Sequence, residues 1–273
     1  MASDPVSDRW RIASGVTPDL ASIDPSTKDG APGGKSETKA TTDALRERLI
    51  ELQARLYAEG KRSLLLVLQA MDAGGKDGTI RAVFAGVNPQ GVRVASFKAP
   101  TDLELAHDFL WRIHAQAPAD GELTVFNRSH YEDVLVARVH HLVPEDVWRS
   151  RYGQIRHFEQ LLHDSGTTVV KVMLHISKDE QRERLQERVD DPGKRWKFNP
   201  GDLAEREHWD AYQQAYADAI GHTSREHAPW YVVPGDRNWY RNWAVLQILV
   251  DALGRMDPQY PPAAEGAEGI TVA

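Results

Sequence analysis

The fold is decided by one stretch of the chain, residues 64–79, which reads LLLVLQAMDAGGKDGT. It opens with the apolar run from Leu64 to Leu68, whose length and composition are typical of a buried parallel strand. A glycine-rich turn follows, and the residues from Thr79 to Phe84 continue with helical periodicity. A strand, a glycine-rich turn, a lysine and a helix in this order predict a phosphate-binding loop.

The turn has the chemistry that a phosphate needs, because its glycines let backbone N–H groups face an oxyanion and Lys76 supplies a mobile cation. The match to the GxxxxGK[ST] pattern is incomplete: Ala70 replaces the first glycine, and Asp77 replaces the hydroxyl residue that ligates magnesium. A carboxylate inside the loop then becomes the substitute metal ligand, and Asp72 is the candidate. The alternative is a glycine-rich turn with a solvated lysine. The residues predicted to bind phosphate here are Ala73, Gly74, Gly75, Lys76, Asp77 and Gly78.

Outward from this loop, short apolar runs alternate with helical periods. The runs predict further buried strands at residues 92–97, 123–126, 169–176 and 230–233. Amphipathic stripes predict helices over Leu45–Leu56, Leu103–Ile113, Trp209–Ile220 and Trp243–Leu253, the first ending near Gly60. This alternation predicts an α/β sandwich with a mostly parallel sheet, in which the ligand lies beyond the carboxyl ends of the strands.

Composition sets the limits of the folded part. Residues 1–40 are rich in Ser, Asp, Pro, Gly and Thr without apolar periodicity, which predicts a flexible or surface-hugging extension. The tail at 258–273 is rich in Pro, Ala, Glu and Gly, so the folded domain is expected at 41–257.

Several classes of protein and site are excluded by composition. No apolar run approaches the roughly 18 residues of a membrane-spanning helix, and the N-terminus lacks a secretory signal. The absence of cysteine excludes disulfides, Fe–S clusters and a thiol nucleophile, and it favours the cytoplasm. The formal net charge of −7 argues against nucleic-acid binding. Histidines lack ligand spacing, so no zinc site is expected.

A second group of candidate residues follows the strand at 123–126, in the sequence FNRSHYED. Asn127 occupies the strand-end position that an acid usually holds, and its alternative role is to cap the following helix. Arg128 is a candidate phosphate clamp, because its planar fork can pair with two oxygens. The alternative for Arg128 is a surface ion pair with Glu132 or Asp133. His130 is expected to be structural, since a phosphate nucleophile is already ionised and needs no base.

The densest basic stretch lies at residues 182–197 and is interrupted by Pro192-Gly193. A hinged basic segment after the strand at 169–176 predicts a lid, at about 178–202, that closes over phosphates and expels water. The alternative is a solvated helix, because acidic residues are interspersed. Its basic residues are Arg182, Arg184, Arg188, Lys194, Arg195 and Lys197. Tryptophans are expected to pack rather than stack on bases, namely Trp196, Trp209, Trp230, Trp239 and Trp243.

Taken together, these segments are similar to the polyphosphate kinase 2 family, over about residues 41–257. The resemblance is carried, in the family order, by LQAMDAGGKDGTIRAVF, GVRVASFKAPT, FLWRIH, FNRSHYEDVLV, HISKDEQRERLQERVDDPGKRWKF and APWYVVPGDRNWYRNW. The chain looks most like the subgroup that phosphorylates both nucleoside monophosphates and diphosphates, because that subgroup carries FNRSHYED where others have an Asp before the Arg.

The resemblance implies a fold and a set of roles. The fold is the thymidylate-kinase-like P-loop kinase sandwich, with three layers around a parallel sheet and a helical lid. The family's loop lysine falls on Lys76, its metal-binding aspartate on Asp72 and its phosphate-binding arginine on Arg128. The second carboxylate of the family falls on Asn127, which puts a two-metal arrangement in doubt. The basic lid residues fall on Arg184, Arg188, Lys194 and Lys197.

The function that the resemblance implies is reversible phosphoryl transfer from inorganic polyphosphate to ADP and AMP, with Mg²⁺ as cofactor and Mn²⁺ as its substitute. Guanine nucleotides (GMP, GDP, GTP) stay open as substrates beside AMP, ADP and ATP, and a homo-oligomer (dimer or tetramer) is expected. Two alternatives stand beside this hypothesis. One is an ATP-dependent nucleoside monophosphate kinase, and the other is an inactive nucleotide-binding P-loop protein, suggested by Ala70, Asp77 and Asn127.

Overall fold

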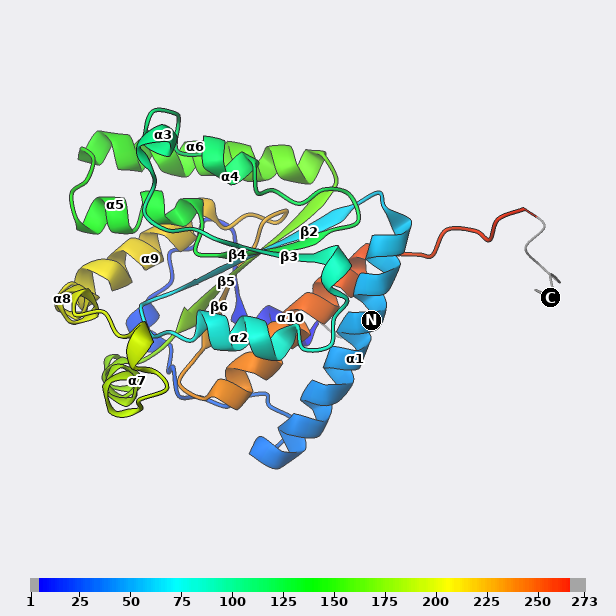
Figure 1. The fold of residues 1–273 in the computed structure, drawn as a ribbon, viewed down its shortest axis with the longest axis horizontal. Coiled ribbons are helices and arrows are strands. Elements are labelled where there is room, and N and C mark those ends of the chain that lie inside the picture. Colours follow the sequence, from blue (N-terminus) through cyan, green and yellow to red (C-terminus); the bar gives the residue numbers. More distant parts are fainter. Residues whose placement is uncertain (1–4, 266–273) are drawn as a thin grey trace.

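A twisted sheet runs through the centre of the molecule (Figure 1). The computed structural model describes residues 5–265, and within them the sheet has six strands in the order β1-β6-β5-β2-β4-β3. β2 to β6 pair in parallel, and β1 joins the β6 edge antiparallel. The strands are β1 (Arg11–Ile12), β2 (Ser63–Ala70), β3 (Val92–Ser96), β4 (Leu123–Asn127), β5 (Thr167–His175) and β6 (Trp230–Pro234).

Helices cover both faces of the sheet (Figure 1), so the molecule has three layers. One layer holds α1 (Lys35–Glu59), α2 (Lys76–Val83) and α10 (Asn238–Met256). The other holds α3 (Asp102–Leu105), α4 (Trp111–His114), α5 (Val136–Val139), α6 (Glu145–Asp164) and α9 (Trp209–Thr223). α7 (Lys178–Asp190) and α8 (Gly201–Glu207) stand at the carboxyl end of the sheet. Short 3₁₀ turns are η1 (Val6–Trp10), η2 (Leu20–Ser22), η3 (Pro89–Gly91), η4 (His130–Asp133) and η5 (Arg195–Lys197).

Two apolar cores lie between these layers, one on each side of the sheet. They form because the central strands carry apolar residues on both faces: β2 is buried at every position from Ser63 to Ala70. Leu65 and Val67 of β2 join the core under α6 and α9, whereas Leu64 and Leu66 join the core under α1 and α10. The five predicted strands and the α/β class with a mostly parallel sheet are confirmed.

The helix predicted over Leu103–Ile113 is wrong, because the chain forms two separate turns, α3 and α4. Leu103 is 63% exposed and therefore does not continue the buried stripe that ends in Ile113. Asp108 causes the break: its Oδ1 accepts the Leu110 N–H at 3.0 Å and its carbonyl accepts the Trp111 N–H at 3.0 Å, which starts a new turn.

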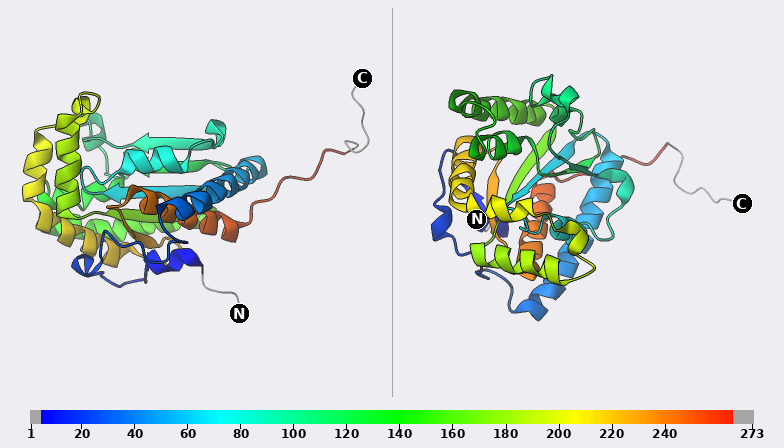
Figure 2. Two further views of the ribbon diagram at one scale, coloured as in Figure 1. Left: turned by 90° about the horizontal axis from the view of Figure 1, so that it is seen from below. Right: turned by 60° about the vertical axis from the view of Figure 1, so that its left-hand side comes forward.

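The N-terminal stretch packs against the folded domain. Residues 5–34 cross the β6 edge of the sheet and lie along its underside in Figure 2. Trp10 is buried and donates from Nε1 to the Tyr240 hydroxyl at 3.1 Å, and Leu20 is buried in the opposite core. Only isolated apolar side chains, such as Trp10 and Leu20, hold this stretch against the domain. Isolated contacts of this kind leave no periodic apolar pattern in the sequence, so the packing could not be predicted from it. α1 begins at Lys35, earlier than expected, and ends at Glu59, where Gly60 caps it with a left-handed φ of 59°.

The tail expected at 258–273 is irregular over 258–265, and its remainder, like residues 1–4, lies outside the described residues. The division into extension, domain and tail at 40 and 257 stays a prediction. Within residues 5–265, no helix is both long enough and apolar enough to cross a membrane.

Candidate active site

The turn between β2 and α2 has the geometry of an anion-binding loop. Gly75 has a φ of 95° and precedes the first residue of α2, Lys76, so the turn leads directly into the helix N-terminus. Ala73 has a left-handed φ of 57°, a rare conformation for a non-glycine residue and one that clusters at functional sites. A Cβ on Gly74 would lie 2.7 Å from the Met71 carbonyl oxygen, so only glycine fits there.

Lys76 lies along the inside of this turn, where its Nζ donates to the Ala70 carbonyl at 2.8 Å. Burial lowers the pKa of Lys76, and the nearby Arg128 cation lowers it further, whereas Asp72 acts in the opposite direction. The lysine is therefore held in an electropositive, partly desolvated position that an anion would stabilise. The alternative of a solvated lysine does not fit these contacts.

The end of β4 lies beside the loop because β4 pairs in parallel with β2, with Leu68 opposite Asn127. Arg128 has a left-handed φ of 62° and donates from Nη2 to Asp72 Oδ1 at 2.9 Å. Its ion-pair partner is therefore the loop aspartate, not Glu132 or Asp133, and Asp133 pairs with Arg151 at 3.2 Å.

Asn127 also turns toward the loop. Its Nδ2 donates to Asp77 Oδ1 at 2.8 Å. The following turn, η4, is capped by Ser129, whose side chain accepts the Tyr131 N–H. The helix-capping role of Asn127 is therefore wrong, and its amide instead ties the strand end to the first turn of α2.

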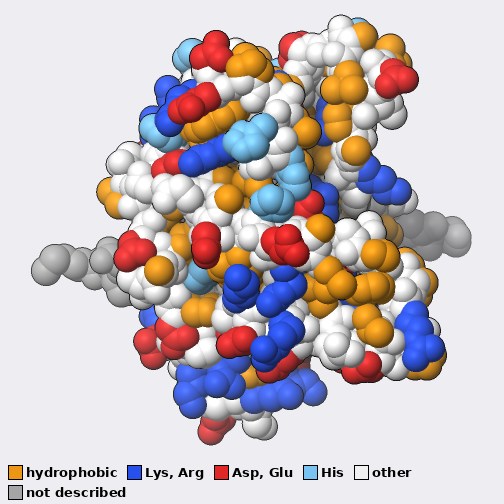
Figure 3. All heavy atoms as spheres, turned by 90° about the vertical axis from the view of Figure 1, so that its left-hand side faces the viewer, with side chains coloured by type: hydrophobic (Ala, Val, Ile, Leu, Met, Phe, Trp, Pro, Cys, Tyr) orange, Lys and Arg blue, Asp and Glu red, His pale blue; other side chains and the backbone are white. Residues whose placement is uncertain are grey.

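One cavity of about 640 Å³ is lined by every residue predicted for the site, and we call it the phosphate groove. Lys and Arg side chains gather on this face of the molecule (Figure 3). The structure thus brings together residues that lie more than a hundred positions apart in the chain. The predicted residues that line the groove are Asp72, Ala73, Gly74, Gly75, Lys76, Asp77, Gly78, Asn127, Arg128, Arg184, Arg188, Lys194 and Lys197.

The basic residues of the lid are each held by a neighbour. Arg184 pairs with Glu180 at 2.8 Å, Arg188 with Asp202 at 3.1 Å and Lys194 with Glu187 at 2.6 Å. Lys197 lies over the ring of Trp196, 5.1 Å from its centroid. These contacts keep the cations at the groove while neutralising part of their charge.

Trp196 is 78% exposed, so its predicted packing role is wrong. It lies in η5, a turn with no buried residue. The spacing of apolar residues in the sequence does not reveal whether a tryptophan in such a short turn is buried or exposed. Trp209, Trp230 and Trp243 are buried, as expected.

Sequence reasoning missed several residues of the groove. Ser96 is the last residue of β3 and Lys98 follows it, at the same sheet edge as the loop, so the strand-end rule would have found both. Arg241 and Asn238 come from α10, far along the chain, and only the packing of α10 against α2 reveals them.

A second, smaller cavity of about 270 Å³ adjoins the groove, and we call it the side cavity. The two cavities share Asp72, Arg128 and Asp202. The side cavity is otherwise acidic and aromatic, lined by Glu132, Glu205, Tyr212 and Tyr216 among others. Burial raises the pKa of Glu132, although Arg128 and Lys76 act in the opposite direction.

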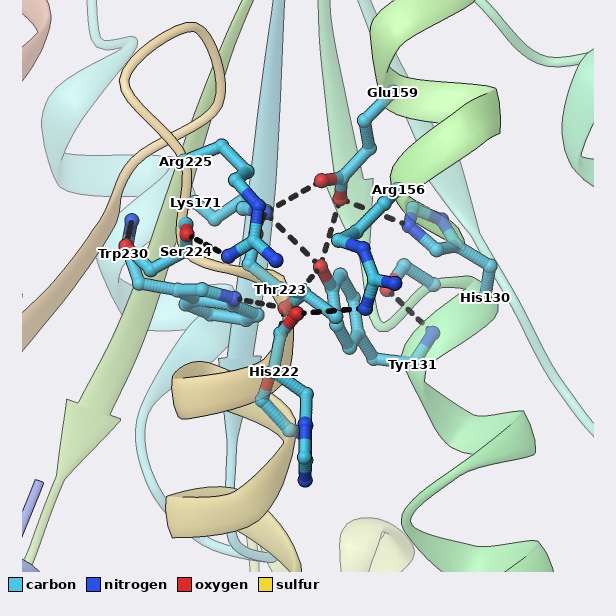
Figure 4. Close-up of polar contacts among 12 residues, drawn as sticks. His130, Tyr131, Arg156, Glu159, Lys171, His222, Thr223, Ser224, Arg225 and Trp230 are labelled. Carbon is cyan, nitrogen blue, oxygen red and sulfur yellow. Dashed lines mark hydrogen bonds and ion pairs between the residues drawn. The ribbon is translucent and has the colours of Figure 1, made fainter. Parts of the chain in front are cut away.

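A buried polar cluster joins β5, α6, η4 and the end of α9 (Figure 4). Lys171 of β5 donates to Glu159 Oε2 of α6 at 2.5 Å and to the Thr223 carbonyl at the end of α9 at 2.8 Å. The hydroxyl of Tyr131 donates to Glu159 Oε1 at 2.7 Å, and His130 Nε2 lies 3.3 Å from the same oxygen. His130 is therefore a buried hydrogen-bonding residue, as expected, and burial lowers its pKa.

Within residues 5–265, no three His, Asp or Glu side chains converge to form a metal site from protein ligands alone. Asp72 and Asp77 are the carboxylates of the loop that line the groove. Arg128 donates a hydrogen bond to Oδ1 of Asp72, and Asn127 donates one to Oδ1 of Asp77. The Oδ2 atom of each carboxylate is left for a cation.

Comparisons of this chain with protein families, individual proteins and solved structures all find polyphosphate kinases or phosphotransferases. The family model described as Polyphosphate kinase 2 (PPK2) matches residues 33–261. The AMP/ADP-polyphosphate phosphotransferase of Meiothermus ruber is 56% identical over 264 residues, covering 97% of this chain and 99% of the relative. The ADP-polyphosphate phosphotransferase of Rhodopseudomonas palustris is 47% identical, covering 79% and 78%. The crystal structure of Polyphosphate Kinase 2 from Arthrobacter aurescens TC1 superposes with a TM-score of 0.92 at 49% identity, covering 96% and 93%.

Proposed function

Because this chain belongs to the polyphosphate kinase 2 family, we propose that it moves phosphoryl groups reversibly between inorganic polyphosphate and the adenine nucleotides AMP, ADP and ATP. The chain is a polyphosphate-dependent phosphotransferase with a P-loop kinase fold. The observation that carries the choice of both AMP and ADP is its similarity to a phosphotransferase named for both acceptors, along nearly the full length of each chain.

The two cavities suggest how the substrates divide. Polyphosphate carries about one negative charge for each internal phosphate, so it suits the phosphate groove, whose walls carry Lys76, Lys98 and the basic residues of the lid. A nucleoside suits the side cavity, because Tyr212 and Tyr216 offer aromatic surface and Glu132 offers a hydrogen-bond acceptor. The phosphates of donor and acceptor would then meet at Asp72 and Arg128, which belong to both cavities.

A divalent cation fits this meeting point. Mg²⁺ usually binds to one or two protein carboxylates together with substrate phosphates and water. Asp72 lines both cavities, whereas Asp77 lines only the phosphate groove. Asp72 would be the principal protein ligand, with Mn²⁺ as a substitute ion. When bound, the cation would neutralise part of the phosphate charge.

The reaction itself needs little covalent chemistry from the protein. In phosphoryl transfer the charge spreads over the oxygens of the moving group, so rate acceleration comes from positioning and from preorganised cations. Lys76 and Arg128 would hold the moving group from two sides, with Arg128 oriented by Asp72 at 2.9 Å. The acceptor phosphate is already ionised at neutral pH and requires no general base. Closure of the lid at about 178–202 would exclude water, which otherwise competes as acceptor.

Several parts of the account extend beyond the catalytic site. Guanine nucleotides are proposed as further substrates, because a cavity lined by tyrosines accepts either purine. We also place the enzyme in the cytoplasm and expect a homo-oligomer, a dimer or a tetramer.

The competing function is an ATP-dependent nucleoside monophosphate kinase, and the donor distinguishes the two. Purified protein is incubated with Mg²⁺ and either polyphosphate or ATP as the sole donor, with AMP, ADP, GMP or GDP as acceptor, and the products are separated by chromatography. We expect polyphosphate to convert AMP to ADP and ADP to ATP. Turnover with ATP and AMP but none with polyphosphate would instead assign the competing function, and no turnover with either would indicate an inactive nucleotide-binding protein.

A further inference from the structure

Arg241 is a buried cation in the wall of the phosphate groove that no part of the mechanism above uses. It projects from α10 and is only 3% exposed, yet it makes no ion pair among the described residues. Its hydrogen bonds go to neutral oxygens: Asn238 Oδ1 at 2.8 Å and Asn242 Oδ1 at 3.0 and 3.3 Å. Burial, and then the nearby Arg184 cation, lower the pKa of Arg241 to about 9, although the Glu180 carboxylate acts in the opposite direction.

The guanidinium lies directly against the phosphate-binding loop. A Cβ on Gly75 would come within 2.1 Å of Arg241 Nη1, and a Cβ on Gly78 would be 3.6 Å from Nη2. Gly75 and Gly78 flank the first residues of α2, where backbone N–H groups and the helix dipole favour an anion. The arginine and the helix N-terminus therefore present positive charge to the same part of the groove.

Arg184, which the sequence predicts to be a phosphate ligand, differs from Arg241 because its N–H groups bond to a carboxylate and to backbone carbonyls. Its Nε pairs with Glu180, its Nη1 donates to the Ala73 carbonyl at 3.2 Å and its Nη2 donates to the Gly235 carbonyl at 2.7 Å. Arg184 thus braces α7 against the loop. Arg241 uses three of its five N–H donors in the contacts above, which leaves two for a ligand.

Burying an uncompensated charge is unfavourable, so an unpaired cation at a groove indicates a missing anion. We propose that Arg241 binds a phosphate group of the polyphosphate donor, beyond the phosphate that is transferred. This inference rests on the proposed function, because it assigns part of the groove to the donor.

The position of Arg241 favours the donor over the nucleotide. No residue of α10 lines the side cavity, where the acceptor is placed. The residues that the two cavities share, Asp72, Arg128 and Asp202, do not include Arg241. Its loss should therefore affect polyphosphate and leave AMP binding nearly unchanged.

The test compares Arg241→Met with Arg255→Met, a matched control on the exposed end of the same helix. Calorimetry measures the Kd of polyphosphate and of AMP for each full-length protein, and a thermal melt measures Tm. Arg241→Met should weaken polyphosphate binding about 10- to 100-fold, the range for a charged hydrogen bond of ~1.5–3 kcal/mol. The Kd of AMP should change less than about twofold, and Tm should stay equal or rise because an unpaired buried charge is removed. Arg255→Met should leave both Kd values unchanged.

Arg241→Lys provides a second variant that keeps the charge but not the planar fork. It should recover part of the polyphosphate affinity, and the slope of affinity against salt should become shallower only in Arg241→Met. Equal weakening of AMP and polyphosphate, or unchanged polyphosphate affinity in both variants, would overturn the proposal. If Arg241→Met does not fold, full polyphosphate affinity in Arg241→Lys would count against a phosphate contact made by the planar fork of Arg241. A wild-type protein that lacks polyphosphate turnover would contradict the proposed function itself, which these binding measurements do not address.

Discussion

The amide of Asn127, at the end of β4, donates a hydrogen bond to the carboxylate of Asp77, in the first turn of α2, at 2.8 Å. Asp77 stands where the GxxxxGK[ST] pattern has a hydroxyl, and Asn127 stands at the strand-end position where a P-loop protein is expected to have an acid. The two departures from the pattern are therefore in direct contact. An aspartate at 127 would place two carboxylates face to face unless a cation lay between them.

We predict that Asn127→Asp changes the ratio of AMP to ADP phosphorylation and makes activity depend more steeply on Mg²⁺. A second carboxylate beside Asp77 would bind a cation more firmly and fix one register of the phosphates, whereas the neutral amide tolerates both acceptors. Initial rates with each acceptor across a Mg²⁺ titration provide the measurement. If both the ratio and the Mg²⁺ dependence stay as in wild type, the link between Asn127 and acceptor range is wrong.

We predict that Lys76→Ala or Asp72→Ala lowers turnover at least about a hundredfold, the usual effect of losing one preorganised charge. Steady-state kinetics with polyphosphate and ADP measure this, and a melt checks that the fold survives. Lys35→Ala, at the exposed start of α1, is the matched control and should keep full activity. Retention of more than about half the activity in either loop variant would show that the site lies elsewhere.

We predict that replacing Lys194 and Lys197 together by Gln weakens the use of polyphosphate more than the use of nucleotide. Both line the groove, and their effect should grow as salt is lowered because screening declines. KM values for polyphosphate and for ADP at several salt concentrations test this. Equal, salt-independent effects on both substrates would indicate that the two lysines only support the shape of the lid.

We predict that Lys171→Met destabilises the protein by about 3–5 kcal/mol, because it leaves Glu159 buried without its partner. Glu159→Leu combined with Lys171→Met removes both charges and should recover most of that loss. Denaturant unfolding of the wild type, both single variants and the double variant measures the coupling. Additive losses in the double variant would mean that the two residues do not act as a pair.

The sequence was sufficient to predict those parts of the molecule that depend on local periodicity. The apolar runs of β2 to β6 and the glycine-rich turn are continuous in the chain, so their structure and their meeting at one sheet edge could be inferred. The residues predicted for the site line one groove for this reason.

Apart from the local break at Asp108, the remaining features depend on packing between distant segments. Trp10 anchors an N-terminal stretch through Tyr240, two hundred and thirty positions away, and nothing local marks that contact. The place of Arg241 against Gly75 likewise follows from how α10 packs on α2. The break at Asp108 reflects a local cap that overrides the apolar stripe from Leu103.

The most direct test of the central claim uses AMP as the only nucleotide and polyphosphate as the only source of phosphoryl groups. Phosphorus NMR follows the polyphosphate and the nucleotides together in the presence of Mg²⁺, with Lys76→Ala in parallel. The account predicts that ADP and then ATP form as polyphosphate shortens, and that both changes are at least about a hundredfold slower in Lys76→Ala. Polyphosphate that stays intact while AMP remains unphosphorylated, or equal rates in the two proteins, would contradict it.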